Sequence, residues 1–224
     1  MNTQRKKILV TAGATQVPID TVRAITNIFS GQTGASIALY CANQGHEVTL
    51  ITSGVCSVAP HESLRYLTYK TFDELLSLMK NEIMCGGYDS IIHSAAVSDY
   101  TVSRVCTFSE KGAMAPLDRS VKISSIHKTI YLELVQTRKI IDMIRKEWGF
   151  CGGLVKFKLQ VAITDEALLE IARKSRASSD ADLIVANCLE WYRQYAYMVG
   201  RDDVAVKVSR DELPMQLERM VTSL

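Results

Sequence analysis

The clearest candidates for chemistry are two segments of small residues near the start of the chain. The first is the apolar run Val10–Thr15, which ends in Ala-Gly-Ala-Thr, and the second is the polar run Ser30–Gly34. Turns without bulky side chains let backbone N–H groups approach phosphate oxygens, and a helix N-terminus adds about half a positive charge there. We therefore predict a phosphate-binding site formed by Gly13, Ala14, Ser30, Gly31 and Gly34. The alternative is that Gly31 and Gly34 only turn the chain into a helix.

Familiar nucleotide signatures do not fit these segments. Gly13–Pro18 lacks the GxGxxG spacing, and Leu50–Ser53 has no carboxylate for a ribose hydroxyl, as a dinucleotide-binding fold requires. No GxxxxGK[ST] phosphate loop surrounds Ser30–Gly34. Tyr66 and Lys70 have the Tyr-xxx-Lys spacing of short-chain reductases, but they lie in a strand-like run. An NADP-dependent reductase is therefore the weakest alternative.

A third candidate segment is His93–Tyr100, where a buried strand ends in small residues and an acid. Ligands of open parallel sheets lie beyond the carboxyl ends of the strands, which is where Ala95, Ala96 and Asp99 would lie. The Asp99 carboxylate could hold Mg²⁺ or a ribose hydroxyl. Capping of a turn or a helix is the alternative role for Asp99.

The elements that position these residues follow from the hydrophobic pattern. Apolar runs alternate with helical periodicity, which predicts βαβ units and an α/β, Rossmann-like three-layer fold with a mostly parallel sheet. The predicted strands are Lys7–Ala12, Glu47–Thr52, Ser90–Ala95, Leu154–Val161 and Asp182–Asn187. The predicted helices are Gly34–Gln44, with a left-handed cap at Gly45, Phe72–Met84, Lys139–Glu147, Asp165–Ser175 and Arg210–Val221.

Two segments break this alternation within what we expect to be a single domain over residues 1–224. Residues 101–128 are basic, contain Gly112 and Pro116 and have no sustained period, so we expect a long functional loop or flap. Residues 195–208 have the pattern of a hairpin at the edge of the sheet.

Composition excludes several classes of protein. The net charge of +2 gives no polyelectrolyte field, so nucleic acid is not an expected partner. The six cysteines include no CxxC pair, which argues against a zinc site and favours a reducing compartment. No run approaches the ~20 apolar residues of a membrane span, and the start of the chain lacks the apolar region of a signal peptide. We therefore expect a cytoplasmic protein that does not bind membranes.

Seven segments, in order, resemble those of phosphopantothenoylcysteine synthetase, the phosphopantothenate cysteine ligase of coenzyme A biosynthesis. They are Thr11–Thr15, Ile19–Asn27, Ser30–Gly34, His93–Tyr100, Lys122–Ser125, Phe157–Leu159 and Ala181–Asn187. They cover nearly the whole chain, and the likeness is greatest to the stand-alone bacterial form of the streptococcal type.

The resemblance implies a homodimeric ligase that joins 4′-phosphopantothenate to L-cysteine through an acyl-nucleotide, consuming CTP or ATP with Mg²⁺. It implies that Lys122, with Lys111 as the second candidate, is the flap lysine that supports formation of the acyl-nucleotide. Asn27 would assist the reaction with cysteine, and Arg23, one helical turn away, would contact the anionic substrate. Ala95, Ala96 and Phe157 would hold the base and ribose, and Asp99 the metal or the sugar. Without the resemblance, Lys122 is a solvent-exposed lysine and Phe157 a core aromatic.

The chain departs from the family pattern at several positions. Ile28 and Phe29 replace a polar His-Ser pair, Arg138 a proline, Lys156 a glycine, Ser178 a phosphate-holding lysine and Cys188 an aspartate. Loss of the lysine would weaken phosphate binding unless Lys156 supplies its charge from another strand. The alternative function is therefore a nucleotide-binding or regulatory protein of the same fold that has lost catalysis.

Overall fold

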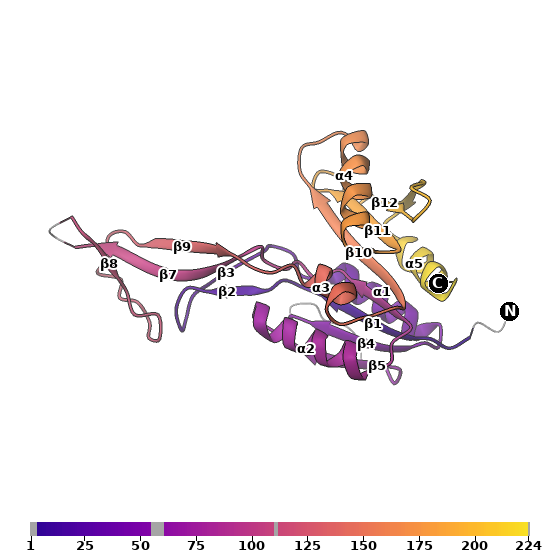
Figure 1. Ribbon diagram of the computed structural model, residues 1–224, viewed down its shortest axis with the longest axis horizontal. Helices are drawn as coiled ribbons and strands as arrows, with labels where there is room; N and C mark the ends of the chain where they lie inside the picture. The colour runs from indigo at the N-terminus through magenta and orange to yellow at the C-terminus, as the bar shows by residue number, and fades with distance from the viewer. Residues whose placement is uncertain (1–3, 55–60, 110–111, 224) are drawn as a thin grey trace.

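The protein is built around one large β-sheet, as the computed structural model of residues 4–54, 61–109 and 112–223 shows (Figure 1). Its strands are β1 (Lys7–Ala12), β4 (Glu47–Thr52), β5 (Leu64–Thr68), β6 (Ser90–His93), β10 (Gly153–Gln160), β11 (Leu183–Cys188), β12 (Tyr195–Val199) and β13 (Ala205–Ser209). They lie in the order β13-β12-β11-β10-β6-β1-β4-β5. All pair in parallel except β12 and β13, which form an antiparallel hairpin at one edge. The predicted α/β fold and its edge hairpin are confirmed.

Helices cover both faces of this sheet and make three layers. They are α1 (Gln32–Asn43), α2 (Phe72–Cys85), α3 (Ile140–Lys146), α4 (Asp165–Ser178) and α5 (Leu213–Ser223). Neighbouring residues of a strand point to opposite faces, so Val10 packs with α1 and α5 whereas Leu9 packs with α2 and α3. Helix α4 packs on β11 and β12. None of the helices in the described ranges is long and apolar enough to cross a membrane.

Several boundaries differ from the sequence-based expectation. Strand β5 was not among the predicted strands, because it lies at the sheet edge and exposes Arg65 and Tyr66. Helix α1 begins two residues early, and Gly45 after it has the predicted left-handed conformation, with φ 89°. Helix α5 begins at Leu213, with Pro214 in its first turn where a missing N–H costs nothing, so Arg210 lies in the preceding turn.

A second sheet forms an arm, residues 100–136, that projects from the body of the molecule (Figure 1). Its central strand β7 (Tyr100–Phe108) pairs antiparallel with β8 (Met114–Pro116) and β9 (Tyr131–Gln136). Within the segment 101–128, for which we expected a long loop or flap, residues 101–108 and 114–116 therefore form strands. A β-bulge between Val102 and Arg104 shifts the register by one residue, which breaks the alternation that would have revealed β7.

The arm is fastened to the body by a small core of its own. A ribbon of β2 (Gln16–Pro18) and β3 (Ala24–Thr26) packs Val17 against Val102, Val105 and Ile123. Beside this core, the buried Asp20 carboxylate accepts hydrogen bonds from the Arg23 side chain and from the Ile123 N–H. The Arg23 guanidinium holds the pKa of Asp20 well below its usual range. The base of the arm is therefore fixed by both packing and charge.

Candidate functional site

The carboxyl ends of the parallel strands open into a cavity of about 720 Å³. It is lined by Gly13 after β1, Ser94–Ala96 after β6, Phe157–Leu159 in β10 and Asn187 in β11. The chain leaves β1 for β4 on one side and later returns to β6 on the other, so the cavity lies at the switch point of the sheet. Open α/β sheets bind their ligands at such points.

Three glycines allow the loop after β1 and the start of α1 to meet at the cavity wall. A Cβ on Gly31, which has φ 87°, would lie 2.2 Å from the Gly13 nitrogen. A Cβ on Gly13, with φ 86°, would lie 2.0 Å from the Ser53 hydroxyl oxygen, and one on Gly34 would lie 2.8 Å from the Ala12 Cβ. Gly31 and Gly34 therefore allow α1 to pack closely against the end of β1, in addition to turning the chain into the helix.

The N-terminus of α1 borders the cavity without a cap. Gly31 provides no side-chain hydrogen bond, and no acidic residue lies in the first turn. Gln32, Thr33 and Gly34 of that turn line the cavity. The first N–H groups of a helix have no partner within it and carry the positive end of its dipole. This wall therefore favours a negatively charged group.

Cationic side chains outnumber acidic ones around the same space. Lys158, Arg193 and Arg210 are among the lining residues, and Asp211 is the single acid among them in the described chain. Arg210 donates to the Asn187 Oδ1 at 3.3 Å and to the Thr33 hydroxyl. Burial lowers the pKa of Arg210. Arg210 was not among the predicted site residues, because an Arg-Asp-Glu run at a predicted helix start is typical of a solvated surface.

Most of the predicted phosphate and nucleotide residues come together here. Gly13, Ser30, Gly31, Gly34, Ala95, Ala96 and Phe157 line the cavity. Phe157 also packs against the core, so both of its expected roles are compatible with its position. Ala14 is buried just behind the wall and forms a bridge to Ala96. Asn27 lies at the same place, because its amide nitrogen donates to the Ala96 carbonyl at 3.2 Å.

Two predicted residues, Lys122 and Asp99, lie outside the cavity lining. Lys122 is exposed on the arm. Asp99 is exposed at the start of the arm, and its side chain makes no hydrogen bond or ion pair within the described part of the chain, so it does not cap a turn there. No group of three or more potential metal ligands occurs among the described residues. Lys111, the second flap candidate, lies outside the described residues.

The expected helical turn between Arg23 and Asn27 is wrong, because β3 separates them. The two side chains have different partners. Arg23 binds Asp20 and donates to the Ile123 carbonyl at 2.8 Å, next to Lys122, whereas Asn27 binds Ala96. Arg23 therefore holds together the base of the arm, whereas Asn27 lies beside the cavity.

Comparison with known proteins identifies the family. Residues 3–221 match the family model described as the DNA/pantothenate metabolism flavoprotein C-terminal domain. The chain belongs to this family. It is 36% identical over 200 residues to the coenzyme A biosynthesis bifunctional protein CoaBC of Thermococcus kodakarensis, covering 88% of this chain but only 45% of that protein. It therefore spans less than half of that relative.

Two further similar proteins have lengths closer to that of this chain. The phosphopantothenate–cysteine ligase 2 of Oryza sativa is 25% identical over 265 residues, covering 94% of this chain and 77% of that protein. The crystal structure of the DNA/pantothenate metabolism flavoprotein from Streptococcus pneumoniae superimposes with a TM-score of 0.87 at 34% identity, covering 97% and 99% of the two chains. The resemblance inferred from the seven segments is thus confirmed.

The departures from the family pattern can now be located. Lys156, which could have replaced the missing lysine, does not supply its charge to the cavity, because its ammonium group donates to the Ser175 carbonyl and the Ser179 hydroxyl at the end of α4. Burial lowers its pKa to about 8. Phe29 forms part of the cavity wall and meets Tyr192 edge to face, at 5.8 Å between ring centroids.

Ile28 also lines the cavity, whereas Ser178, Cys188 and Arg138 lie away from it. Ser178 is exposed near the end of α4, and its hydroxyl donates to the Ser175 carbonyl. Cys188 is buried, and its thiol donates to the Glu190 carboxylate. Arg138 pairs with Glu147 on the surface. None of these side chains blocks the cavity.

Proposed function

We propose that this chain joins 4′-phosphopantothenate to L-cysteine in coenzyme A biosynthesis, with CTP as the activating nucleotide and ATP as the alternative. The observation that carries the proposal is the cationic cavity at the uncapped start of α1, in a chain of this family. The names of the Oryza and Thermococcus relatives support the ligase activity and the pathway.

The proposed reaction has two steps, and each part of the cavity has a role in them. A carboxylate is a poor electrophile, so a phosphopantothenate carboxylate oxygen attacks the α-phosphorus and pyrophosphate leaves. The cysteine amine then attacks the acyl carbon, and the nucleoside monophosphate leaves. Fixed N–H groups and cations favour this reaction because they meet negative charge as it develops. The start of α1 holds the phosphates, and Phe157 with the backbone of Ala95 and Ala96 holds the base and ribose.

Three side chains would act around this nucleotide. Asn27, placed beside Ala96, assists the second step. Arg23 holds the segment that carries Lys122, and its contact with the anionic substrate remains a prediction. Asp99 is free to serve as a Mg²⁺ ligand, since this ion commonly uses one or two carboxylates together with substrate phosphates. Bound Mg²⁺ would neutralise charge on the pyrophosphate.

We further propose a cytoplasmic homodimer in which Lys122 acts in the cavity of the other protomer. The arm projects from the body of the molecule (Figure 1), and Lys122 on this arm is not among the residues that line the cavity. Large apolar side chains are exposed along the same arm: Tyr100, Phe108, Met114, Val121, Ile126, Tyr131, Leu134 and Val135. Apolar groups gathered in this way are typical of protein interfaces.

Product formation tests the ligase directly. The pure protein, incubated with phosphopantothenate, cysteine, Mg²⁺ and CTP, should release pyrophosphate and form phosphopantothenoylcysteine, both measurable by mass spectrometry. Parallel reactions with ATP, GTP and UTP would identify the nucleotide. Absence of product with every nucleotide would overturn the ligase. A cavity that binds nucleotide without turnover would then favour the binding-protein alternative, which the position of Lys156 and the aromatic Phe29 support.

Mixing two inactive variants tests the dimer. Lys122→Ala and Asn27→Ala should each abolish most activity, because each removes one member of every site. In the mixed dimer one site regains both residues if they come from different protomers. Random exchange should then restore about a quarter of the wild-type activity, since half of the dimers are mixed and each has one complete site. No recovery after confirmed exchange would place Lys122 in its own protomer's site.

A further inference from the structure

Arg210 holds a position that the fold defines from three directions. It lies between β13 and α5 and is one of the residues that line the cavity, and its guanidinium group binds two others. One amino group donates to the Asn187 Oδ1 at the end of β11, and the other donates to the Thr33 hydroxyl in the first turn of α1. Both acceptors are uncharged. These bonds therefore fix the guanidinium in place but do not neutralise it.

No carboxylate within 4.0 Å pairs with this guanidinium among the residues that the structure describes. Asp211 follows it in the chain and also lines the cavity, yet the two form no ion pair. Burial lowers the pKa of Arg210, and no carboxylate opposes that effect. A guanidinium carries five N–H donors, so donors remain for a ligand. A partly buried and unpaired cation is costly unless an anion binds it.

The start of α1, in the adjacent wall of the cavity, also favours a bound anion. Thr33, which accepts the Arg210 hydrogen bond, belongs to the uncapped first turn of that helix. Two positive features thus lie side by side, the helix dipole and the guanidinium. A phosphoryl group bound between them would satisfy both, and a guanidinium matches its oxygens in a bidentate manner.

We propose that Arg210 binds a phosphoryl group of the nucleotide and provides a cation for that group in the cavity. This inference rests on the proposed function in one respect, because it takes the ligand to be a nucleoside triphosphate. It assigns Arg210 to the phosphates and not to the base or ribose. Affinity must therefore depend on Arg210 only when phosphates are present.

Calorimetric titration of cytidine, CMP, CDP and CTP tests this assignment. Arg210→Gln should weaken CTP binding by ~10- to 100-fold, the effect of losing a charged hydrogen bond, while cytidine binding changes by less than about twofold. Arg210→Lys, which keeps the charge but not the bidentate geometry, should fall between. Arg219→Gln removes the same charge from an exposed site on α5 and should bind CTP as the wild type does.

Other outcomes of this titration would contradict the assignment of Arg210 to the phosphates. If Arg210→Gln lost affinity equally for cytidine and CTP, Arg210 would contact the base or ribose, and the proposal would be overturned. Unchanged CTP binding by Arg210→Gln would also overturn it. So would a wild-type protein that binds cytidine, CMP, CDP and CTP with equal affinity. Thermal melts of each variant without ligand confirm that it is folded. A wild type that binds CTP through Arg210 but forms no product would leave this inference standing and refute the ligase alone.

Discussion

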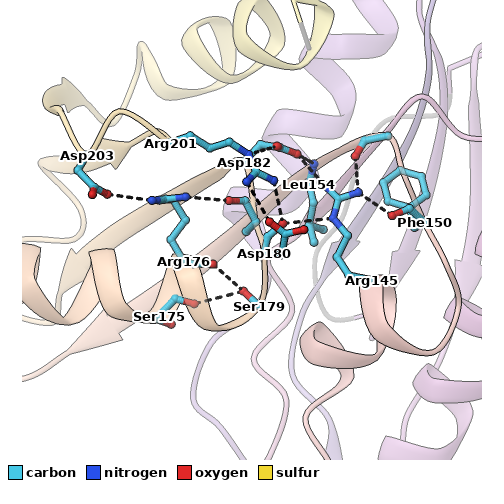
Figure 2. Close-up of polar contacts among 12 residues, drawn as sticks. Arg145, Phe150, Leu154, Ser175, Arg176, Ser179, Asp180, Asp182, Arg201 and Asp203 are labelled. Carbon is cyan, nitrogen blue, oxygen red and sulfur yellow. Dashed lines mark hydrogen bonds and ion pairs between the residues drawn. The ribbon is translucent and has the colours of Figure 1, made fainter.

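Arginines at the two ends of the central sheet differ in whether they are paired with a carboxylate. At the amino ends of β10 and β11, three arginines each bind a carboxylate, as Figure 2 shows for Arg145, Arg176 and Arg201. At the carboxyl ends, Arg210 lies in the cavity wall with only uncharged partners among the described residues. The same residue type is therefore neutralised at one end of the strands and left available at the other.

Asp182 is the centre of the paired end. Its carboxylate accepts from Arg145 at 2.8 Å, from Arg201 at 2.7 Å and from the Leu154 N–H at 2.8 Å (Figure 2). Arg145 also donates to the Phe150 carbonyl. These bonds connect α3, the start of β10 and the turn after β12. Here charge fixes the arrangement of elements.

The difference separates structural cations from ligand-binding ones. A buried charge is tolerated in the free protein when a carboxylate and further hydrogen bonds compensate its loss of water. A cation held only by neutral groups lacks that compensation, so a bound anion can contribute much more there. The comparison thus predicts unequal effects for matched substitutions at the two ends.

The largest effect is expected at the paired end. Asp182→Asn keeps the shape of the side chain but leaves Arg145 and Arg201 without their shared charge, which should lower the free energy of unfolding by about 3 kcal/mol. Urea denaturation at pH 7 measures it. Asp180→Asn is the matched control, because Asp180 pairs with Arg201 at the surface and an exposed pair contributes about 1 kcal/mol or less. Equal losses would contradict the central role of Asp182.

Lys156 is a second cation with only neutral hydrogen-bond partners, but it faces α4 and not the cavity. Its pKa is lowered to about 8 from 10.5, so between these pH values the unfolded chain binds more protons than the folded one. Stability should therefore rise with pH across this window, by about 3 kcal/mol. Below pH 8 the cost of the buried charge is fully present.

Lys156→Met should remove that rise and stabilise the protein at pH 7 without changing nucleotide affinity. Urea denaturation at pH 7, 8, 9 and 10 provides the measurement. Lys158→Met, two residues along the same strand, is the control for other groups that titrate in the window and should keep the slope. A Lys156→Met protein that keeps the slope would show that the ammonium is solvated when folded.

The sequence predicted the body of the fold better than the arm, for a physical reason. Strands such as β1 and β11 are buried on both faces and therefore form continuous apolar runs. Strand β7 is half exposed, and its bulge interrupts the alternation on which recognition depends. Strand β5 exposes charged and aromatic side chains at the sheet edge. The local sequence pattern thus predicts strands that are enclosed by the core much better than strands that are partly exposed.

The same contrast holds for the candidate site. Glycines and alanines at strand ends, such as Gly13 and Ala96, were predictable because backbone approach limits the residue type. Arg210 was not, because its place depends on contact with Thr33, 177 residues earlier in the chain. Arg23 and Asn27 were placed on a helix, although i and i+4 also share a face in a strand. Tertiary contacts decided their partners.

The smallest effect is expected from Arg210→Gln in the free protein. Because no carboxylate loses a partner, its free energy of unfolding should change by less than about 1 kcal/mol. Arg145→Gln removes one of the two arginines that pair with Asp182 and should therefore lose more. Saturating CTP should raise the melting temperature of the wild type well above that of Arg210→Gln, since stabilisation by a ligand follows its affinity. Scanning calorimetry with and without CTP measures both. If Arg210→Gln proved as destabilising as Arg145→Gln without ligand, Arg210 would be structural, and the two ends of the sheet would not differ.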